Sequence, residues 1–231
     1  MAKQQQPQPG LSRFYLLLVG IAVVGAGVLG FLAMSRRTVS IPVDVTVLAA
    51  DTAGFRGYLI GSPDAPVEIT EYADFQCPAC QDFATIQFPD VRSRLIETGK
   101  LRWRYRDFPL DDIHPFARLA SHSAACADEP GRFEAQFERI NQGHGEWNRG
   151  GANGAFRRYA EANGLDMDRY DECMRSTRYA GRIQASLEEG VRLGVSGTPT
   201  FLLNGRLYTN GLNSDEIRAL VDSLIPAPTA P

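Results

Sequence analysis

The sequence predicts an α/β fold that is preceded by one transmembrane helix. Two strand-like segments, at 67–74 and 100–108, flank a helix that begins at Pro78, and a helical block follows over 114–193. An uncharged, mostly apolar run of 21 residues lies near the N-terminus, at 14–34. Apolar residues make up 44% of the chain and charged residues 22%, which is typical of a globular protein with a substantial core.

Charge and motif content exclude several classes of function. The chain of 231 residues has a net charge of −3 and an isoelectric point near 5.7, so no overall basic field attracts it to nucleic acid. No glycine-rich phosphate loop or dinucleotide fingerprint stands between a strand and a helix. Four cysteines are too few for a small fold that depends on disulfides. We therefore expect no nucleic-acid partner.

The N-terminal segment predicts a membrane anchor. Residues 1–13 are rich in Gln and Pro, and we expect them to be disordered on the cytoplasmic side. At 1.5 Å per residue, the run at 14–34 spans about 31 Å of helix, which matches a bilayer core. The alternative is a cleaved signal peptide, whose apolar core usually has about 7–15 residues before a small-residue cleavage site. This run is longer and ends at Arg36 and Arg37 without such a site, which favours an uncleaved single-pass anchor.

The segment after the anchor predicts a linker and then one domain. Residues 35–56 form the linker, and the alternating valines at 43–47 indicate a possible edge strand. The domain extends over 57–225. Its strand at 100–108 has three arginines on one face, which we expect to be solvated, and three apolar residues on the other: Leu101, Trp103 and Tyr105.

The helical block predicts an insertion at about 112–194. Two apolar stripes with helical spacing indicate helices with one buried face: Phe133, Phe137 and Ile140, and Ala180, Ile183, Leu187 and Val191. A hairpin is expected at 200–208 because Asn204 and Gly205 favour a two-residue turn. Ser214 is expected to cap a last helix, and 226–231 to form a disordered tail.

The motif Cys77-Pro-Ala-Cys80 carries the strongest chemical signal. It follows a predicted strand and opens a predicted helix, so the Cys77 sulfur lies near unpaired N–H groups and the positive end of the helix dipole. Both favour a thiolate, with a pKa in the range of about 3.5–7.5 found for such motifs. Pro78 suits the first helical turn, where no N–H donor is needed. Cys80, one turn along, can attack a mixed disulfide formed at Cys77.

Two other interpretations of this motif are a metal site and an inert structural disulfide. A structural zinc site needs four ligands, usually with a second pair at short spacing. Cys126 and Cys173 lie 47 residues apart, and the histidines are scattered: His114, His122 and His144. We therefore expect neither a metal nor another bound cofactor.

Two segments together resemble a known family. YADFQCPAC, and SGTPTFLLNG about 120 residues later, are similar to the DsbA-like branch of the thioredoxin superfamily, and more closely to its membrane-anchored bacterial thiol–disulfide oxidoreductases. The resemblance covers about Gly57 to Leu224. It implies a thioredoxin fold, in which a central mixed β-sheet is flanked by helices and carries an α-helical insertion.

The resemblance also implies roles for five residues. Cys77 is the exposed nucleophile and Cys80 the resolving thiol. Pro199 is a cis proline that faces them, with Thr198 before it; the alternative is a trans proline that opens an edge strand. Glu71 stands where this superfamily has a buried acid, and it is expected to relay a proton to or from Cys80. The alternative for Glu71 is a solvent-facing position on its strand.

The other two cysteines suggest a second disulfide. In an oxidising compartment the even cysteine count favours a Cys126–Cys173 bond that ties two helices together, and some relatives have a cysteine pair in these helices. The alternative is two free buried thiols. One residue departs from the family pattern: Ala79 stands where strongly oxidising members have a histidine that helps to hold the thiolate. This departure predicts a less oxidising redox couple.

The function implied is disulfide exchange with cysteines of secreted or envelope proteins, outside the cytoplasm and most simply in the oxidase direction. The resemblance further implies a quinone-linked membrane partner of the DsbB or vitamin-K-epoxide-reductase type. One alternative is the same chemistry as a reductase or isomerase. Others are a chaperone or metal-handling module that uses Cys77 and Cys80 as ligands, and a glutathione-transferase-like relative of the inserted fold.

Overall fold

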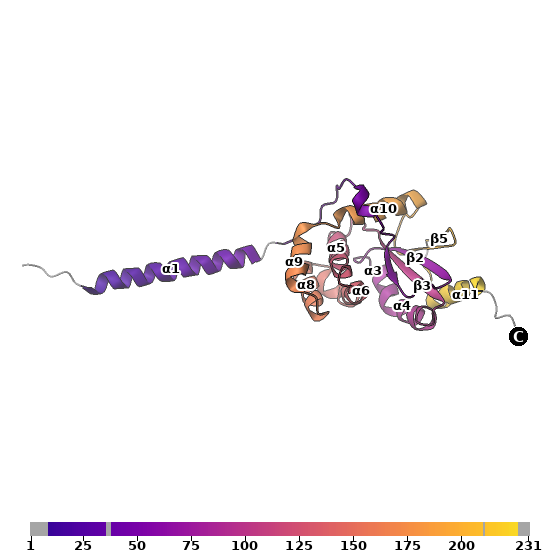
Figure 1. The fold of residues 1–231 in the computed structure, drawn as a ribbon, viewed down its shortest axis with the longest axis horizontal. Coiled ribbons are helices and arrows are strands. Elements are labelled where there is room, and N and C mark those ends of the chain that lie inside the picture. The colour runs from indigo at the N-terminus through magenta and orange to yellow at the C-terminus, as the bar shows by residue number, and fades with distance from the viewer. Residues whose placement is uncertain (1–8, 36–37, 210, 226–231) are drawn as a thin grey trace, which may run out of the picture. The chain divides into compact units, whose positions relative to one another are not determined.

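The computed structural model describes residues 9–35, 38–209 and 211–225, and it divides into two compact units at Thr38 and Val39. The first unit contains one helix, α1 (Pro9–Ser35). The second unit contains the sheet and the other helices (Figure 1). The disorder expected at 1–8 and 226–231 concerns residues outside the described part of the chain.

Helix α1 begins at Pro9, five residues before the expected start of the anchor and inside the segment predicted to be disordered. Proline fits this place because the first turn of a helix has no use for its missing N–H. Among the described residues, no helix combines the length and the apolar character needed to cross a bilayer. The membrane span expected at 14–34 therefore stays a prediction.

The sheet of the second unit is mixed, as the resemblance implies. Its five strands lie in the order β1-β3-β2-β4-β5. Strands β2 and β3 are parallel, and the other neighbouring pairs are antiparallel. The strands are β1 (Tyr58–Ile60), β2 (Val67–Ala73), β3 (Leu101–Asp107), β4 (Thr200–Leu203) and β5 (Arg206–Tyr208). The expected strands at 67–74 and 100–108 differ from β2 and β3 only at their ends.

The first helix after β2 is not regular. It runs as α3 (Pro78–Asp82), a π-helical turn at Phe83–Gln87, α4 (Phe88–Val91) and a second π-helical turn at Arg92–Ile96. Pro89 lies in the first turn of α4 and has no N–H to donate to a carbonyl one turn back. At the end of the preceding π-helical turn, the Phe88 N–H bonds to the Phe83 carbonyl, five residues back.

The remaining helices form the insertion and the C-terminal element. In Figure 1 the insertion helices α5, α6, α8 and α9 gather on one side of the sheet. Asn204 and Gly205 adopt the positive φ values of a tight hairpin turn between β4 and β5. The helices are α5 (Ala117–Asp128), α6 (Phe133–Gln142), α7 (His144–Trp147), α8 (Ala152–Ala162), α9 (Met167–Ser176), α10 (Ala180–Leu193) and α11 (Ser214–Leu224).

The edge strand expected at 43–47 is wrong. These residues form no strand, and a short helix, α2 (Ala49–Thr52), follows them. The sheet edge is β1, which pairs with β3 and buries Tyr58 and Ile60 to 2% exposure each, whereas Val43 stays 49% exposed. Alternation at 43–47 does not produce a strand because no described strand pairs with this segment, although Val45 packs against the core.

Three further details differ from expectation. The arginine face of β3 is only partly solvated: Arg102 and Arg104 are partly exposed and bind Glu68, whereas Arg106 is 4% exposed against Glu189 of α10. The apolar stripe of α10 does not extend to its end, where Val191 is 59% exposed. The N-cap of α11 is not Ser214 but the residue before it, Asn213, which forms a capping box with Glu216.

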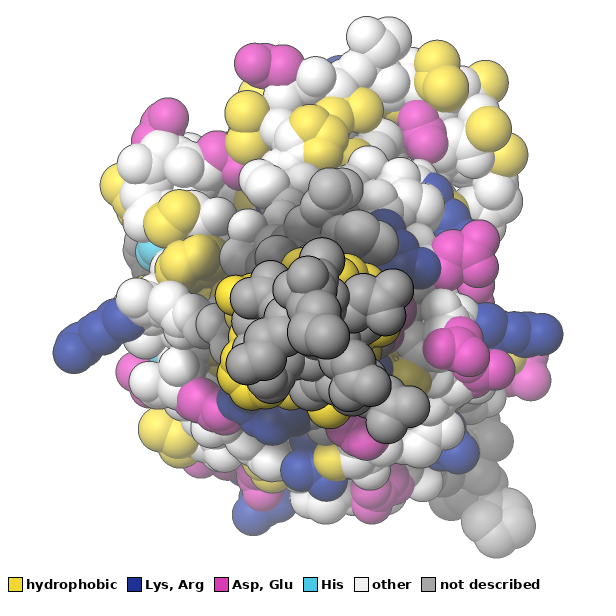
Figure 2. All heavy atoms as spheres, turned by 90° about the vertical axis from the view of Figure 1, so that its left-hand side faces the viewer, with side chains coloured by type: hydrophobic (Ala, Val, Ile, Leu, Met, Phe, Trp, Pro, Cys, Tyr) yellow, Lys and Arg dark blue, Asp and Glu magenta, His cyan; other side chains and the backbone are white. Residues whose placement is uncertain are grey.

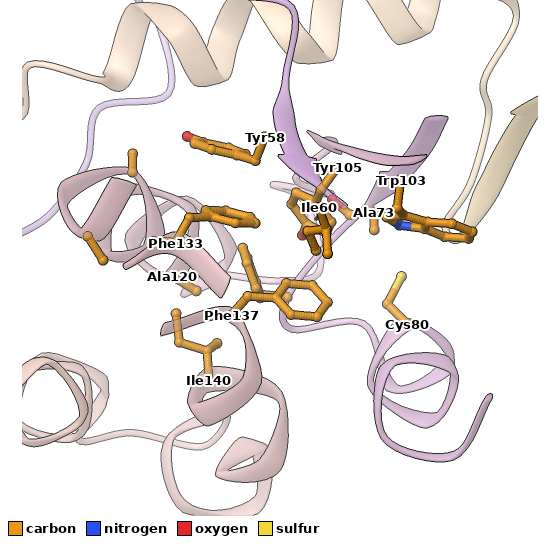
Figure 3. Close-up of a cluster of buried hydrophobic side chains, with 14 of the residues drawn as sticks. Tyr58, Ile60, Ala73, Cys80, Trp103, Tyr105, Ala120, Phe133, Phe137 and Ile140 are labelled. Carbon is orange, nitrogen blue, oxygen red and sulfur yellow. Dashed lines mark hydrogen bonds between the residues drawn. The ribbon is translucent and has the colours of Figure 1, made fainter. Parts of the chain in front are cut away.

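The core joins the sheet to the insertion. Figure 3 shows aromatic side chains of β1 and β3 facing Phe133 and Phe137 of α6, with Cys80 at the edge of the cluster. The rings of Tyr58 and Phe133 stack at 4.0 Å between centroids, and Tyr105 meets Phe137 edge-on at 5.4 Å. This packing fixes the insertion against the sheet, next to the helix that carries the cysteine pair.

Candidate active site

Cys77 is the N-cap residue of α3, as the motif predicts. It has extended backbone angles, and Pro78 follows as the first helical residue. The Cys77 N–H donates to the Asp74 carbonyl at 3.1 Å. The Cys77 Sγ lies 3.5 Å from the Thr198 carbonyl oxygen, although the two residues are 121 positions apart in the sequence. Cys77 and Cys80 are free thiols in this structure, and both are buried. The exposure expected for Cys77 is therefore wrong: only 7% of the residue is exposed, because it packs into the core cluster beside the Thr198 carbonyl.

The environment of Cys77 favours its thiolate. A hydrogen bond from the Cys80 thiol lowers the pKa of Cys77 to about 5, although partial burial acts in the opposite direction. The Thr198 side chain and the backbone N–H groups of Cys80 and Ala79 lower the pKa further. The N–H groups are those of the first turn of α3, so the helix terminus acts here as expected.

Cys80 has the opposite character. It is 3% exposed, and burial raises the pKa of its thiol well above the ordinary value; the neighbouring Cys77 and Glu71 raise it further. Figure 3 shows its sulfur directed from α3 toward the sheet, where Trp103 lies. One sulfur of the pair is therefore a thiolate at neutral pH and the other a buried thiol.

Glu71 is buried, as expected, on β2. It is 2% exposed, and the indole N–H of Trp103 donates to its Oε2 at 3.0 Å. Burial raises the pKa of Glu71 to about 8, and the bond from Trp103 only partly offsets this. Glu71 therefore holds a proton at neutral pH, close enough to Cys80 to affect the pKa of that thiol.

The peptide bond between Thr198 and Pro199 is cis, which confirms the prediction. It lies immediately before β4, which pairs with β2 in the centre of the sheet. This pairing brings the Thr198 carbonyl to the sulfur of Cys77. The structure therefore brings together all five residues predicted for the site: Cys77, Cys80, Thr198, Pro199 and Glu71.

Sequence reasoning missed the hydrogen bonds that hold the turn before Cys77. The buried Asp74 carboxylate accepts from the N–H of Leu110 at 2.8 Å and from His114 Nδ1 at 2.7 Å. Gln76 contacts residues of the insertion with both its side chain and its carbonyl. In the sequence, only the position of Asp74 and Gln76, between the end of a strand and the nucleophile, could have indicated this role. His114 thus takes part in holding this turn through its bond to Asp74.

Cys126 and Cys173 form a disulfide, as predicted, with 5.8 Å between their Cα atoms. It joins α5 to α9 inside the insertion, and both residues are buried. His122 lies beside it, with Nε2 3.7 Å from the Cys126 sulfur. Within the described residues, this trio forms a cluster of potential metal ligands, but two of its three donors are bonded to each other.

Comparison with known sequences identifies a family. The family model described as Thioredoxin matches residues 56–223. A Na⁺/H⁺ antiporter NhaA 3 of Salinispora tropica is 36% identical over 168 residues, which are 73% of this chain and 24% of that protein. The chain thus spans about a quarter of the length of the first such relatives. Disulfide bond formation protein D of Bacillus subtilis is 20% identical over 168 residues, 71% of this chain and 75% of that protein.

Solved structures share the fold. BdbD from Bacillus subtilis superposes with a TM-score of 0.65 at 19% identity, over 72% of this chain and 91% of that one. α-DsbA1 from Wolbachia pipientis gives a TM-score of 0.63 at 23% identity, over 72% and 89%. DsbA from Chlamydia trachomatis gives 0.65 at 20% identity, over 79% and 97%. At these identities the likeness concerns the fold.

Proposed function

Because the chain belongs to the thioredoxin family, we propose that it is a DsbA-like thiol–disulfide oxidoreductase. It exchanges disulfides with cysteines of secreted or envelope proteins outside the cytoplasm, and it acts as an oxidase. The observation that carries the proposal is the contrast between the two thiols: Cys77 ionises readily at a helix N-terminus, while Cys80 is held as a buried thiol.

The oxidase reaction balances with the residues present. A substrate thiolate attacks the Cys77 sulfur of the Cys77–Cys80 disulfide, the S–S bond breaks, and Cys80 leaves with the electron pair. Glu71 gives its proton to Cys80. A second substrate thiolate then attacks the substrate sulfur of the mixed disulfide and releases Cys77 as a thiolate. Two electrons pass from the substrate to the enzyme.

The pairing of Thr198 and Pro199 suits a site that receives an extended peptide. The proline has no N–H, and the Thr198 carbonyl lies at the Cys77 sulfur. We propose that substrate backbone docks beside these two residues while its cysteine reaches Cys77. No bound cofactor takes part in this scheme.

The proposal includes a membrane anchor at 14–34 and a quinone-linked membrane partner that reoxidises the dithiol. Exposed apolar side chains along α1 support the anchor, among them Leu16, Leu17 and Ile21. The Cys126–Cys173 disulfide supports an oxidising compartment. Acidic and basic side chains are interspersed on the face drawn in Figure 2, which fits the proposal of no nucleic-acid partner.

A reductase or isomerase is the second candidate, and Ala79 favours it. This residue is exposed between the two cysteines and has no imidazole to hold the thiolate. Against it stands the lowered pKa of Cys77, which the helix terminus and the Cys80 thiol achieve without a histidine. A stabilised thiolate favours the reduced enzyme and therefore a more oxidising couple.

The reduction potential of Cys77–Cys80 tests the proposal. The protein is equilibrated in glutathione buffers, its thiols are alkylated, and each cysteine is assigned by mass spectrometry, so that Cys126–Cys173 is followed separately. We expect a value of about −120 to −180 mV, as in disulfide donors. A value near −270 mV, close to that of thioredoxin, favours the reductase. Stoichiometric bound metal without any thiol exchange would favour the metal-handling alternative.

A further inference from the structure

Gln76, the residue before the nucleophile, uses all of its hydrogen-bonding groups although it is buried. Its Oε1 accepts from the Phe116 N–H at 2.7 Å, and its Nε2 donates to the Asn148 carbonyl at 2.9 Å. Its own N–H donates to the Asp74 carboxylate at 2.7 Å. Its carbonyl accepts from His144 Nε2 at 2.9 Å. Four partners hold this residue in one orientation.

Three of these residues form a closed ring of hydrogen bonds. Gln76 donates to the Asn148 carbonyl, the Asn148 side-chain amide lies 3.3 Å from His144 Nδ1, and His144 Nε2 returns to the Gln76 carbonyl. Because a carbonyl only accepts, Nε2 of His144 carries the proton and Nδ1 accepts from the amide. His144 and Asn148 are the first residue and the C-cap of α7, so the ring ties the insertion to the turn before Cys77.

The ring acts on the peptide group between Gln76 and Cys77. Its oxygen is held by His144, and its N–H donates to the Asp74 carbonyl at 3.1 Å. A planar peptide held at both ends cannot rotate freely. Its plane sets the direction in which the Cys77 side chain leaves the backbone. The sulfur is thereby aimed at the first N–H groups of α3, those of Ala79 and Cys80.

We propose that Gln76 is a positioning residue, through which the helical insertion holds Cys77 in the geometry that stabilises its thiolate. The role deepens the proposed exchange reaction and rests on it. On this view the insertion does more than cover the active site. Its helix α7 sets the acidity of the nucleophile from across the turn, without touching the sulfur.

The test compares two variants of the full chain with Cys77–Cys80 reduced and Cys126–Cys173 intact. Gln76→Met keeps the side-chain length and removes the two hydrogen bonds of the side-chain amide, to Phe116 and Asn148. His144→Phe keeps a ring against Trp147, whose centroid lies 5.3 Å away, and removes the donor to the Gln76 carbonyl. The pKa of Cys77 is measured from the rate of alkylation against pH and from thiolate absorbance, neither of which needs a protein substrate.

Two further variants are the controls. Gln136→Met removes another fully buried glutamine, whose amide bonds to Ser123 and Phe156 within the insertion. His144→Gln is the conservative rescue, because its amide N–H can replace the Nε2 donor. If Gln76 had only a structural role, Gln136→Met would shift the pKa of Cys77 as much as Gln76→Met does. Circular dichroism and thermal melting establish that each variant is folded.

We expect Gln76→Met and His144→Phe to raise the pKa of Cys77 by about one unit, a tenfold loss of thiolate at low pH. Gln136→Met and His144→Gln are expected to keep the wild-type value. An unchanged pKa in a folded His144→Phe protein overturns the inference, even if Gln76→Met fails to fold. An equal shift in Gln136→Met also overturns it. A wild type with an acidic Cys77 but no disulfide exchange contradicts the proposed function instead.

Discussion

Cys77 and Cys80 have the same side chain and opposite chemistry. Cys77 stands at a helix terminus, where hydrogen bonds outweigh its burial and lower its pKa, while burial dominates at Cys80, one turn along, and raises the pKa of that thiol. Because burial penalises charge and N–H groups favour it, one helical turn is enough to divide the roles of nucleophile and resolving thiol. Glu71, protonated at neutral pH, is close enough to affect the pKa of the thiol that must gain and lose a proton.

At the residue scale, Glu71→Gln is predicted to impair proton transfer to and from Cys80. We expect slower release of mixed disulfides and loss of the ionisation near pH 8 from the pH profile of thiol exchange, since the pKa of Glu71 is about 8. The profile is measured in stopped-flow experiments with a disulfide-bonded peptide. Glu68→Gln is the matched control, because Glu68 stands on the same strand but binds Arg102 and Arg104 on the other face. An unchanged profile in Glu71→Gln would refute the relay.

Glu71 also links folding to pH. Its folded pKa of about 8 exceeds its ordinary value of 4.5, so folding favours the protonated form. The stabilisation is complete below pH 4.5 and is lost as pH rises to 8, on the order of 1.4 kcal/mol per unit of pKa difference. The test is urea unfolding of the oxidised protein, in which neither Cys77 nor Cys80 titrates. Between pH 5 and 8, the free energy of unfolding of Glu71→Gln should increase relative to that of the wild type. A constant difference over that range would contradict the burial of the acid.

At the element scale, the insertion is held together by its own bond. The Cys126–Cys173 disulfide joins α5 to α9 across 47 residues of sequence, and both cysteines are buried. The contacts of α6 with β1 and β3, and of α7 with Gln76, connect the insertion to the sheet and to the nucleophile. The disulfide therefore stabilises the insertion internally, whereas the contacts of α6 and α7 hold it in place against the sheet.

Removing this disulfide should destabilise the protein without changing the redox chemistry of Cys77 and Cys80. The double substitution Cys126→Ala and Cys173→Ala is expected to lower the free energy of unfolding by about 2–4 kcal/mol, through the greater entropy of the unfolded chain. The reduction potential of Cys77–Cys80 should stay at its wild-type value. Guanidinium unfolding and glutathione equilibration measure the two quantities on the same samples. A large shift in potential would mean that the second disulfide takes part in tuning the site.

At the scale of the whole molecule, the thiolate couples the redox state to stability. Folding lowers the pKa of Cys77 from 9.0 to about 5, so the reduced protein gains stability from the thiolate at high pH. That gain is complete above pH 9 and is lost as pH falls through 5. We therefore expect the free energy of unfolding of the reduced form to rise relative to that of the oxidised form as pH rises from 5 to 8. Denaturation curves of both forms at several pH values check this, and a pH-independent difference would contradict the lowered pKa of Cys77.

Much of the fold and most of the site followed from local patterns. The strands β2 and β3, the helix start at Pro78 and the hairpin turn at Asn204 and Gly205 each have a local cause, namely alternation, a proline at a helix start and positive φ. The motif at Cys77 is read from adjacent residues. By contrast, alternation at 43–47 failed because a strand needs a partner as well as a pattern, and none is present there.

By itself, the sequence determined the reactive pair and the family, because a cysteine motif at a strand–helix junction and a distant Thr-Pro segment can be recognised from the order of residues alone. Only the tertiary structure decided what surrounds them. Burial of Arg106 against α10, and the ring of hydrogen bonds from Gln76 to α7, join residues 83 and 68 positions apart. Such contacts depend on how the insertion packs on the sheet. The acidity of Cys77 is set by that packing as well as by its own motif.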